Sequence, residues 1–188
     1  MKQEEFKLFV PGRLCLFGEH SDWAGGHRRQ NSGLEKGYAI VAPTNQGNYS
    51  NVRAIPSQLF RLKSTPFQTQ FEASLNATEL EKIAQKGGIF SYAAGTVAAM
   101  LDYFNGYHSG FNINGKTHGI EIENYKNDLP LKKGLSSSAS LCVTVAKAFN
   151  QLYQLSLNAE GIMDRAYQGE IKTPSRCGRL DQACAFNS

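Results

Sequence analysis

The chain has 188 residues, of which 41% are hydrophobic, and its 20 Lys and Arg against 16 Asp and Glu give a formal charge of +4. That size and apolar content suffice for one domain with a real core, and no apolar run approaches the roughly 18 residues of a membrane span. The basic excess is mild and dispersed, no nucleic-acid motif is recognisable, and the first residues do not resemble a signal peptide. We therefore expect a cytoplasmic protein that handles small molecules, with neither nucleic acid nor membrane as a partner; its oligomeric state stays open.

Strand patterns dominate the first half of the chain and helix patterns the second. Strands are predicted over 8–20, interrupted by Pro11 and Gly12, over 37–44 and 47–55, separated by Pro43 and Gly47, and over 67–75 and 118–124. Helical patterns cover 77–88, 90–106, 137–153 and 158–171. The last residues, 181–188, form an apolar run that fits a helix or a strand. This mixture predicts an α+β fold with mixed sheets and packed helices.

The four cysteines, which lie far apart and show no CxxC spacing, favour reduced thiols over a disulfide frame or a zinc site.

A serine-rich loop, "PLKKGLSSSAS" at 130–140, lies between a strand pattern and a helix pattern. A helix N-terminus that follows a strand and a turn presents unpaired backbone N–H groups to an anion. Ser136, Ser137 and Ser138 would add hydroxyl donors, or a ligand for a magnesium ion. The other interpretation is a common serine N-cap after a turn. No lysine follows Gly134, so this is not a Walker loop.

A second polar cluster occurs in "PGRLCLFGEHSDWAGG" at 11–26, which places Arg13, Glu19, His20 and Asp22 around glycine turns. Carboxylates accept hydrogen bonds from hydroxyls and histidine can donate or accept, so the cluster suits several hydroxyls of one sugar. Taken alone it also fits a surface loop, or a weak metal site of unusual spacing.

Together, these two stretches and "CGRLDQ" at 177–182 resemble the motifs of the GHMP kinase family, and within it those of the galactokinases most closely. The family forms are PGRxNLxGEHxDYNGG, PxGxGLSSSA and CGIMDQ. Three matches in the right order over almost the whole chain are far more specific than any one of them.

The resemblance implies an N-terminal GHMP kinase domain over 1–188 that uses ATP and Mg²⁺ to phosphorylate a hydroxyl, C1 by analogy, of a galactose-like sugar. Asp181 matches the catalytic aspartate and Arg13 the arginine that stabilises it. Glu19, His20 and Asp22 match sugar-contacting positions. ATP would contact the residues of the serine loop, namely Lys133, Gly134, Leu135, Ser136, Ser137, Ser138 and Ala139.

The metal ligands implied by the resemblance are Ser137 or Ser138 and Glu170, although the gap from Glu170 to Asp181 is one residue shorter than in the family. Asp181 can also be interpreted as the N-cap of a helix. Lys132 and Lys133 replace residues that are usually small, and would either crowd the nucleotide or contact a phosphate. Arg28 and Arg29 would read a sugar carboxylate or phosphate, or lie in a solvated loop.

The family's C-terminal glycine-rich motif does not occur in the chain, so we expect a piece of a longer protein without the C-terminal domain. Three functions stay open on the sequence: a sugar kinase, a sugar- and ATP-binding fragment or sensor without catalysis, and a structural domain that only resembles the family. The intact Arg13, Glu19, Asp22, Ser138 and Asp181 argue against the third.

Overall fold

The computed structural model describes residues 5–19, 21, 27–28, 30–107, 118–129, 136–175 and 177–187. Its strands form one mixed sheet in the order β1-β2-β5-β3-β4. β3 and β5 are parallel, and the other neighbouring pairs are antiparallel. The strands are β1 (Glu5–Phe17), β2 (Ile40–Ile55), β3 (Leu59–Ser64), β4 (Thr69–Ser74) and β5 (Gly119–Asn127). The mixed sheet and its helices confirm the predicted α+β class.

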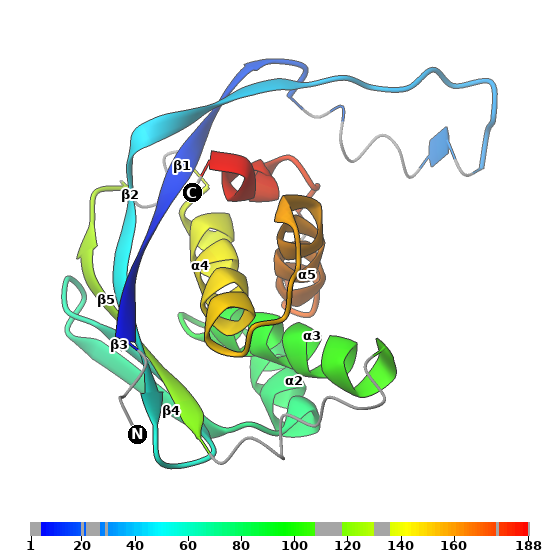
Figure 1. Cartoon of the computed structure of the whole chain (residues 1–188). Helices are drawn as coiled ribbons and strands as arrows, with labels where there is room; N and C mark the ends of the chain where they lie inside the picture. Colours follow the sequence, from blue (N-terminus) through cyan, green and yellow to red (C-terminus); the bar gives the residue numbers. More distant parts are fainter. Residues whose placement is uncertain are drawn as a thin grey trace.

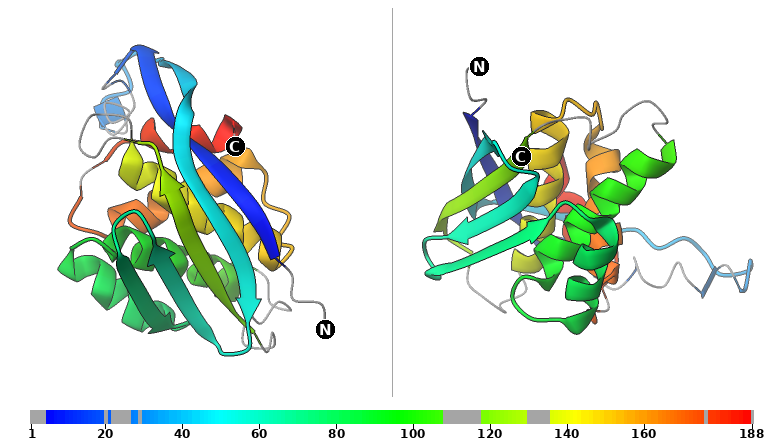
Figure 2. Two further views of the ribbon diagram at one scale, coloured as in Figure 1. Left: turned by 90° about the vertical axis from the view of Figure 1, so that its left-hand side faces the viewer. Right: turned by 90° about the horizontal axis from the view of Figure 1, so that it is seen from below.

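The helices cover one face of this sheet (Figure 1), and the view onto the sheet shows them behind it (Figure 2). They are α2 (Ala77–Lys86), α3 (Ser91–Tyr107), α4 (Ser137–Leu152), α5 (Ala159–Ile171) and the 3₁₀ helix η2 (Asp181–Asn187). The sequence allows Thr78 or Asn76 as the cap of α2 and indicates Asn158 as that of α5. In the structure Asn76 and Asn158 are the caps, because their side chains accept from the N–H groups of Glu79 and Gly161. Within the described part of the chain, no helix combines the length and apolar character needed to cross a membrane.

The predicted strand breaks at two prolines are wrong. β1 runs through Pro11, with a register shift between Pro11 and Arg13, and β2 runs through Pro43 as one strand. A proline is tolerated where its missing N–H is not needed by a neighbouring strand. β1 is an edge strand, and β2 begins to pair with β5 only at Asn48, so both prolines lie where one side of the strand is unpaired.

One strand, β3, was not predicted, although its sequence alternates as a half-buried strand should. Phe60 and Leu62 are buried in the core, while Arg61 and Lys63 lie on the opposite face. There they surround the almost fully buried carboxylate of Glu121, which also accepts from Arg53 Nε at 2.8 Å. On this face of the sheet, the carboxylate of Glu121 therefore links β5 to both of its neighbouring strands through three cations.

Helices α3 and α5 approach closely at two glycines, which fixes where the end of α5 lies. A Cβ atom added at Gly169 would lie 2.3 Å from Thr96 Cα, and one at Gly95 would lie 2.3 Å from the carbonyl oxygen of Gly169. Since real Cβ contacts of this kind do not occur, only glycine allows the two backbones to touch. The contact sets the position of Glu170, the next residue in α5.

Candidate functional site

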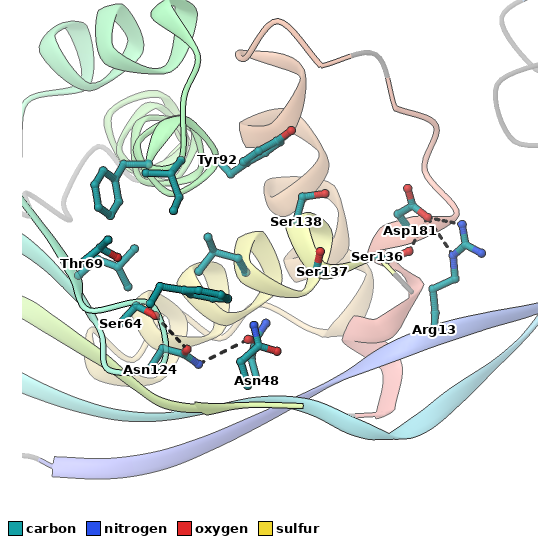
Figure 3. Close-up of a pocket in the computed structure, with 16 residues that line it drawn as sticks. Arg13, Asn48, Ser64, Thr69, Tyr92, Asn124, Ser136, Ser137, Ser138 and Asp181 are labelled. Carbon is teal, nitrogen blue, oxygen red and sulfur yellow. Dashed lines mark hydrogen bonds and ion pairs between the residues drawn. The ribbon is translucent and has the colours of Figure 1, made fainter. Parts of the chain in front are cut away.

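A cavity of about 590 Å³ opens beside the N-terminus of α4, between that helix, the sheet and the start of α3 (Figure 3). Its volume lies within the range of small-molecule sites, roughly 300–1,000 Å³. One end is polar and carries Arg13, Ser136 and Asp181. The remainder is lined by apolar and aromatic side chains together with polar ones. The apolar and aromatic residues are Leu62, Phe67, Ile89, Phe90, Tyr92 and Leu141, and the polar ones include Asn48, Ser64, Thr69, Asn124 and Asn127.

At the polar end, the carboxylate of Asp181 accepts several hydrogen bonds on a single oxygen. Arg13 Nε lies 2.8 Å from Asp181 Oδ1, and Arg13 Nη2 forms an ion pair with the same oxygen. The hydroxyl of Ser136 donates to Oδ1 as well, at 2.6 Å. Among the described residues no hydrogen bond reaches Oδ2. Oδ1 thus holds all the hydrogen bonds to Asp181 that the described residues make, and Oδ2 holds none of them.

Arg13 is a buried cation between two carboxylates. Besides Asp181 it contacts Glu19 Oε1 more loosely, at 3.4 Å from each terminal nitrogen. Burial lowers the pKa of the Arg13 guanidinium, but the hydrogen bond and charge of Asp181, followed by those of Glu19, outweigh burial and raise the pKa overall. Arg13 therefore supplies a fixed positive charge at the polar end of the cavity.

Ser136 does not act as the side-chain N-cap that the sequence left as an alternative. It stands immediately before α4 in the left-handed region, with φ 58°, and its hydroxyl makes no cap hydrogen bond. That hydroxyl bonds Asp181 instead. As a result, the first N–H groups of α4 carry no side-chain cap from Ser136, and Ser136, Ser137 and Ser138 line the cavity.

Behind the cavity wall lies a second carboxylate, Glu170, which is 2% exposed. Its Oε1 accepts from the hydroxyl of Ser138 at 3.0 Å, and its Oε2 accepts from Gln182 Nε2 at 2.6 Å. Burial raises the pKa of the Glu170 carboxyl; the two hydrogen bonds lower it in part, and the charge of Asp181 raises it further. Ser138 connects this buried acid to the cavity.

A polar network under the serines fixes α4 to the sheet. Asn48 Nδ2 donates to Ser140 Oγ at 2.8 Å, and Ser140 Oγ in turn donates to the carbonyl oxygen of Val10 at 3.1 Å. Asn124 Nδ2 reaches Asn48 Oδ1 at 3.4 Å and two backbone carbonyls. Since Val10 lies on the strand that carries Arg13, the network relates the start of α4 to that arginine.

The thiols near the site are protonated rather than reactive. Burial raises the pKa of Cys177 and of Cys184 to about 12 in each case.

Among residues that the structure describes, no group of three His, Cys, Asp or Glu side chains is arranged to hold a metal ion. A cation accompanying a nucleotide needs fewer protein ligands, because phosphates and water complete the shell. Ser138 Oγ and Glu170 Oε1 have the oxygen chemistry that Mg²⁺ prefers.

The structure brings Arg13, Ser136 and Asp181 together, and joins Ser138 to Glu170. Ala139 is fully buried, and the side chain of Glu19 is 55% exposed and contacts Arg13. Arg28 is exposed, which fits the solvated-loop alternative. The remaining predicted positions lie outside the described residues, namely His20, Asp22, Arg29, Lys132, Lys133, Gly134 and Leu135.

Gln182, Asn48 and Asn124 are polar residues of the site that were not predicted, and Ser64, Thr69 and Asn127 in the cavity lining were not predicted either. Gln182 belongs to the quoted motif at 177–182, and the two asparagines stand in strands, where Asn is disfavoured. The motif and the two unusual asparagines are visible in the sequence. Neither of them shows that Gln182 contacts the carboxylate of Glu170 or that Asn48 contacts helix α4.

Comparison with protein families and curated proteins gives a consistent match. The protein-family model described as GHMP kinases N terminal domain matches residues 91–188 of this chain. A galactokinase of Lacticaseibacillus casei is 32% identical over 155 residues, which is 81% of this chain and 33% of that protein. A galactokinase of Pyrococcus furiosus is 29% identical over 175 residues, covering 92% of this chain and 41% of the relative. The chain thus spans about a third to two fifths of the length of these curated relatives.

Solved structures agree in fold. The structure of Lactococcus lactis galactokinase complexed with galactose matches 96% of this chain and 41% of its own, with a TM-score of 0.70 and 25% identity. Methanococcus jannaschii mevalonate kinase matches with a TM-score of 0.72 at 20% identity, over 97% of this chain and 51% of its own; this likeness shows the fold alone.

Proposed function

The chain belongs to the GHMP kinase family, and from that premise we propose that it forms the N-terminal part of an ATP-dependent sugar kinase. The reaction would transfer the γ-phosphoryl group of ATP to a hydroxyl, C1 by analogy, of a galactose-like monosaccharide. The observation that carries the proposal is the polar end of the cavity, where Arg13, Ser136 and Asp181 meet beside the N-terminus of α4.

Phosphoryl transfer requires mainly positioning and neutralisation of charge, with little covalent chemistry from the protein. In the proposed mechanism Asp181 Oδ2, which is free of described partners, accepts the proton of the attacking hydroxyl or orients that hydroxyl. Arg13 and Ser136 hold Oδ1, so the carboxylate cannot turn away. In this proposal the charge of Arg13 would also stabilise the negative charge that develops on the transferred group.

The nucleotide is proposed to lie along the cavity. Its phosphates would meet the N–H groups at the start of α4 and the hydroxyls of Ser136, Ser137 and Ser138. The aromatic end, with Phe90 and Tyr92, suits the faces of a purine base. Ser138 and Glu170 would hold the accompanying Mg²⁺, which neutralises charge on the phosphates when bound.

The sugar is proposed to lie at the outer side of Arg13, where the stretch 11–26 would supply Glu19, His20 and Asp22. Glu19 Oε1 lies 3.4 Å from Arg13 Nη1, so this carboxylate lies near the polar end of the cavity.

A second candidate function is binding of the sugar and ATP without phosphoryl transfer. It is kept as a candidate because the two relatives are matched over 33% and 41% of their length, so the comparison bears on that part of those proteins alone.

The test measures ADP release and equilibrium binding with galactose, arabinose and galacturonate, on the chain and on any longer protein that contains it. A kinase gives sugar-dependent ADP release that Asp181→Asn reduces by about 10²–10⁴-fold, the usual contribution of a positioned base. ATP-analogue binding without turnover in either protein would favour the second candidate. Failure of both proteins to bind an ATP analogue would refute the proposal.

A further inference from the structure

Gln182 is a buried polar residue that the proposed mechanism does not use. It is fully buried and follows Asp181 directly in η2. Its side-chain Nε2 donates to Glu170 Oε2 at 2.6 Å, and Cys177 Sγ lies at the limit of contact, 4.0 Å away. Its Oε1 has no hydrogen-bond partner among the described residues.

The orientation of this amide is informative. A carboxylate accepts hydrogen bonds, so an NH₂ group that faces Glu170 matches the ionised form of the acid. In this orientation the amide oxygen of Gln182 is left buried and unsatisfied in the described part of the chain, which is unfavourable by itself. The bond to Glu170 is therefore the contact that determines how Gln182 lies.

The bond also determines how Glu170 lies. Gln182 holds Oε2 on the side of the acid facing η2, which leaves Oε1 beside the hydroxyl of Ser138 at 3.0 Å. Ser138 lines the cavity, whereas Glu170 lies behind it. Without Gln182 the carboxylate would be free to turn about its last bond, and the pair formed by Glu170 Oε1 and Ser138 Oγ would lose its geometry.

We propose that Gln182 is a positioning residue, which holds Glu170 so that its Oε1 and Ser138 Oγ form an oxygen-ligand pair for the divalent cation that accompanies the nucleotide. The inference rests on the proposed function and assigns a role to a side chain that touches neither cation nor nucleotide. Partners of metal-binding carboxylates commonly act in this way. Because Asp181 and Gln182 are adjacent, one turn of η2 positions both acids of the site.

The experiment titrates Mn²⁺, in place of Mg²⁺, into the chain saturated with a non-hydrolysable ATP analogue, and measures free Mn²⁺ by electron paramagnetic resonance. Gln182→Met, of similar length but without a donor, is expected to weaken Mn²⁺ binding about 10–100-fold, as for other partners of metal ligands. Affinity for the analogue without metal is expected to stay the same. Gln151→Met, at an exposed position on α4, is the matched control and leaves both affinities unchanged.

Two further variants keep the test decisive. Gln182→Asn retains the amide but is shorter by one methylene, so it tests the same contact if Gln182→Met does not fold. In a Glu170→Gln background, Gln182→Met is expected to cause no additional loss of Mn²⁺ affinity, because it acts through Glu170.

The possible failures are distinguishable. Wild-type Mn²⁺ affinity in every folded Gln182 variant, with a loss in Glu170→Gln, would overturn this inference and leave the proposed function standing. An additive loss in the double variant would also overturn it. A wild-type chain that binds the analogue but no Mn²⁺ would overturn the inference alone, and one that binds neither would overturn both.

Discussion

The ion pair between Arg13 and Asp181 is predicted to be strongly coupled, and a double-mutant cycle on stability tests this without any ligand. The perturbations are Arg13→Met, Asp181→Asn and the two together. Two N–H groups of Arg13 meet the same oxygen of Asp181, and the side chains are 9% and 29% exposed, respectively. The geometry is that of a partly buried, charge-assisted pair.

The expected magnitude follows from this exposure. Breaking a fully buried pair costs about 3–5 kcal/mol, whereas exposed pairs couple by about 0.2–1 kcal/mol. Since Asp181 remains open to solvent on one side and Ser136 still donates to it, we expect a coupling energy of about 2 kcal/mol, near the lower end for hydrogen bonds to charged groups. The free energy of unfolding that the double variant loses should therefore be smaller, by this coupling energy, than the sum of the losses in the two single variants.

The assay is urea denaturation of the four proteins, followed by circular dichroism, with the free energy of unfolding extrapolated to water. The pair of Arg179 and Asp164 is the matched control, because its charges lie 3.2 Å apart and its side chains are 49% and 31% exposed. It should couple by no more than about 1 kcal/mol. A coupling below about 0.5 kcal/mol for Arg13 and Asp181 would refute the view that this pair is structurally fixed.

Two other substitutions test the frame around the site. Gly169→Ala places a methyl group 2.3 Å from Thr96 Cα and is expected to cost about 1–3 kcal/mol of stability by overpacking, measured by urea denaturation. Gly161→Ala is the control, because the three atoms nearest to the added Cβ are side-chain atoms at 3.2 to 3.5 Å, Leu157 Cβ among them. It should change stability by less than about 1 kcal/mol, roughly the helix-propensity difference. An equal loss of stability in Gly169→Ala and Gly161→Ala would contradict the close-packing argument. Burial raises the pKa of Glu121, but hydrogen bonds from its three cations outweigh burial and lower the pKa below 4.5. Its stabilisation is therefore complete above pH 4.5 and is lost as pH falls through the lower folded value, so Glu121→Gln should be less stable by about 2 kcal/mol at pH 7 and should approach the wild type in acid. A difference that grows in acid would contradict this sign.

The helices were predictable because their signals are local. Asparagine caps, terminal glycines and apolar spacing all act within a few residues. Asparagines cap the starts of α2 and α5, and Gly87 ends α2. The strand breaks at Pro11 and Pro43 were wrong for a non-local reason. Whether a proline interrupts a strand depends on whether a neighbour needs its N–H, and the order of strands in the sheet decides that.

At the site, too, local motifs predicted which residues take part, whereas the contacts between those residues are non-local. Motif resemblance found Arg13, Ser136 and Asp181, but the contact between Arg13 and Asp181 joins residues 168 positions apart, and no spacing rule gives its geometry. Gln182 was quoted as part of a motif without a role, because only the fold shows that it faces Glu170. Sequence therefore predicted which side chains meet at the cavity more readily than it predicted which contacts hold them there.

The position of Glu170 illustrates how the fold can accommodate a departure from a motif. The sequence between Glu170 and Asp181 is one residue shorter than the family pattern, which made Glu170 the least secure of the predicted metal ligands. In the structure the contact between Ser138 and Glu170, at 3.0 Å, joins two helices and does not depend on the connection from α5 to η2. The approach of Gly95 and Gly169 places α5 against α3, and so places Glu170. A shorter connection can change the path of the chain after α5 while this contact is kept, provided that Gln182 still reaches Glu170 from η2, as it does at 2.6 Å.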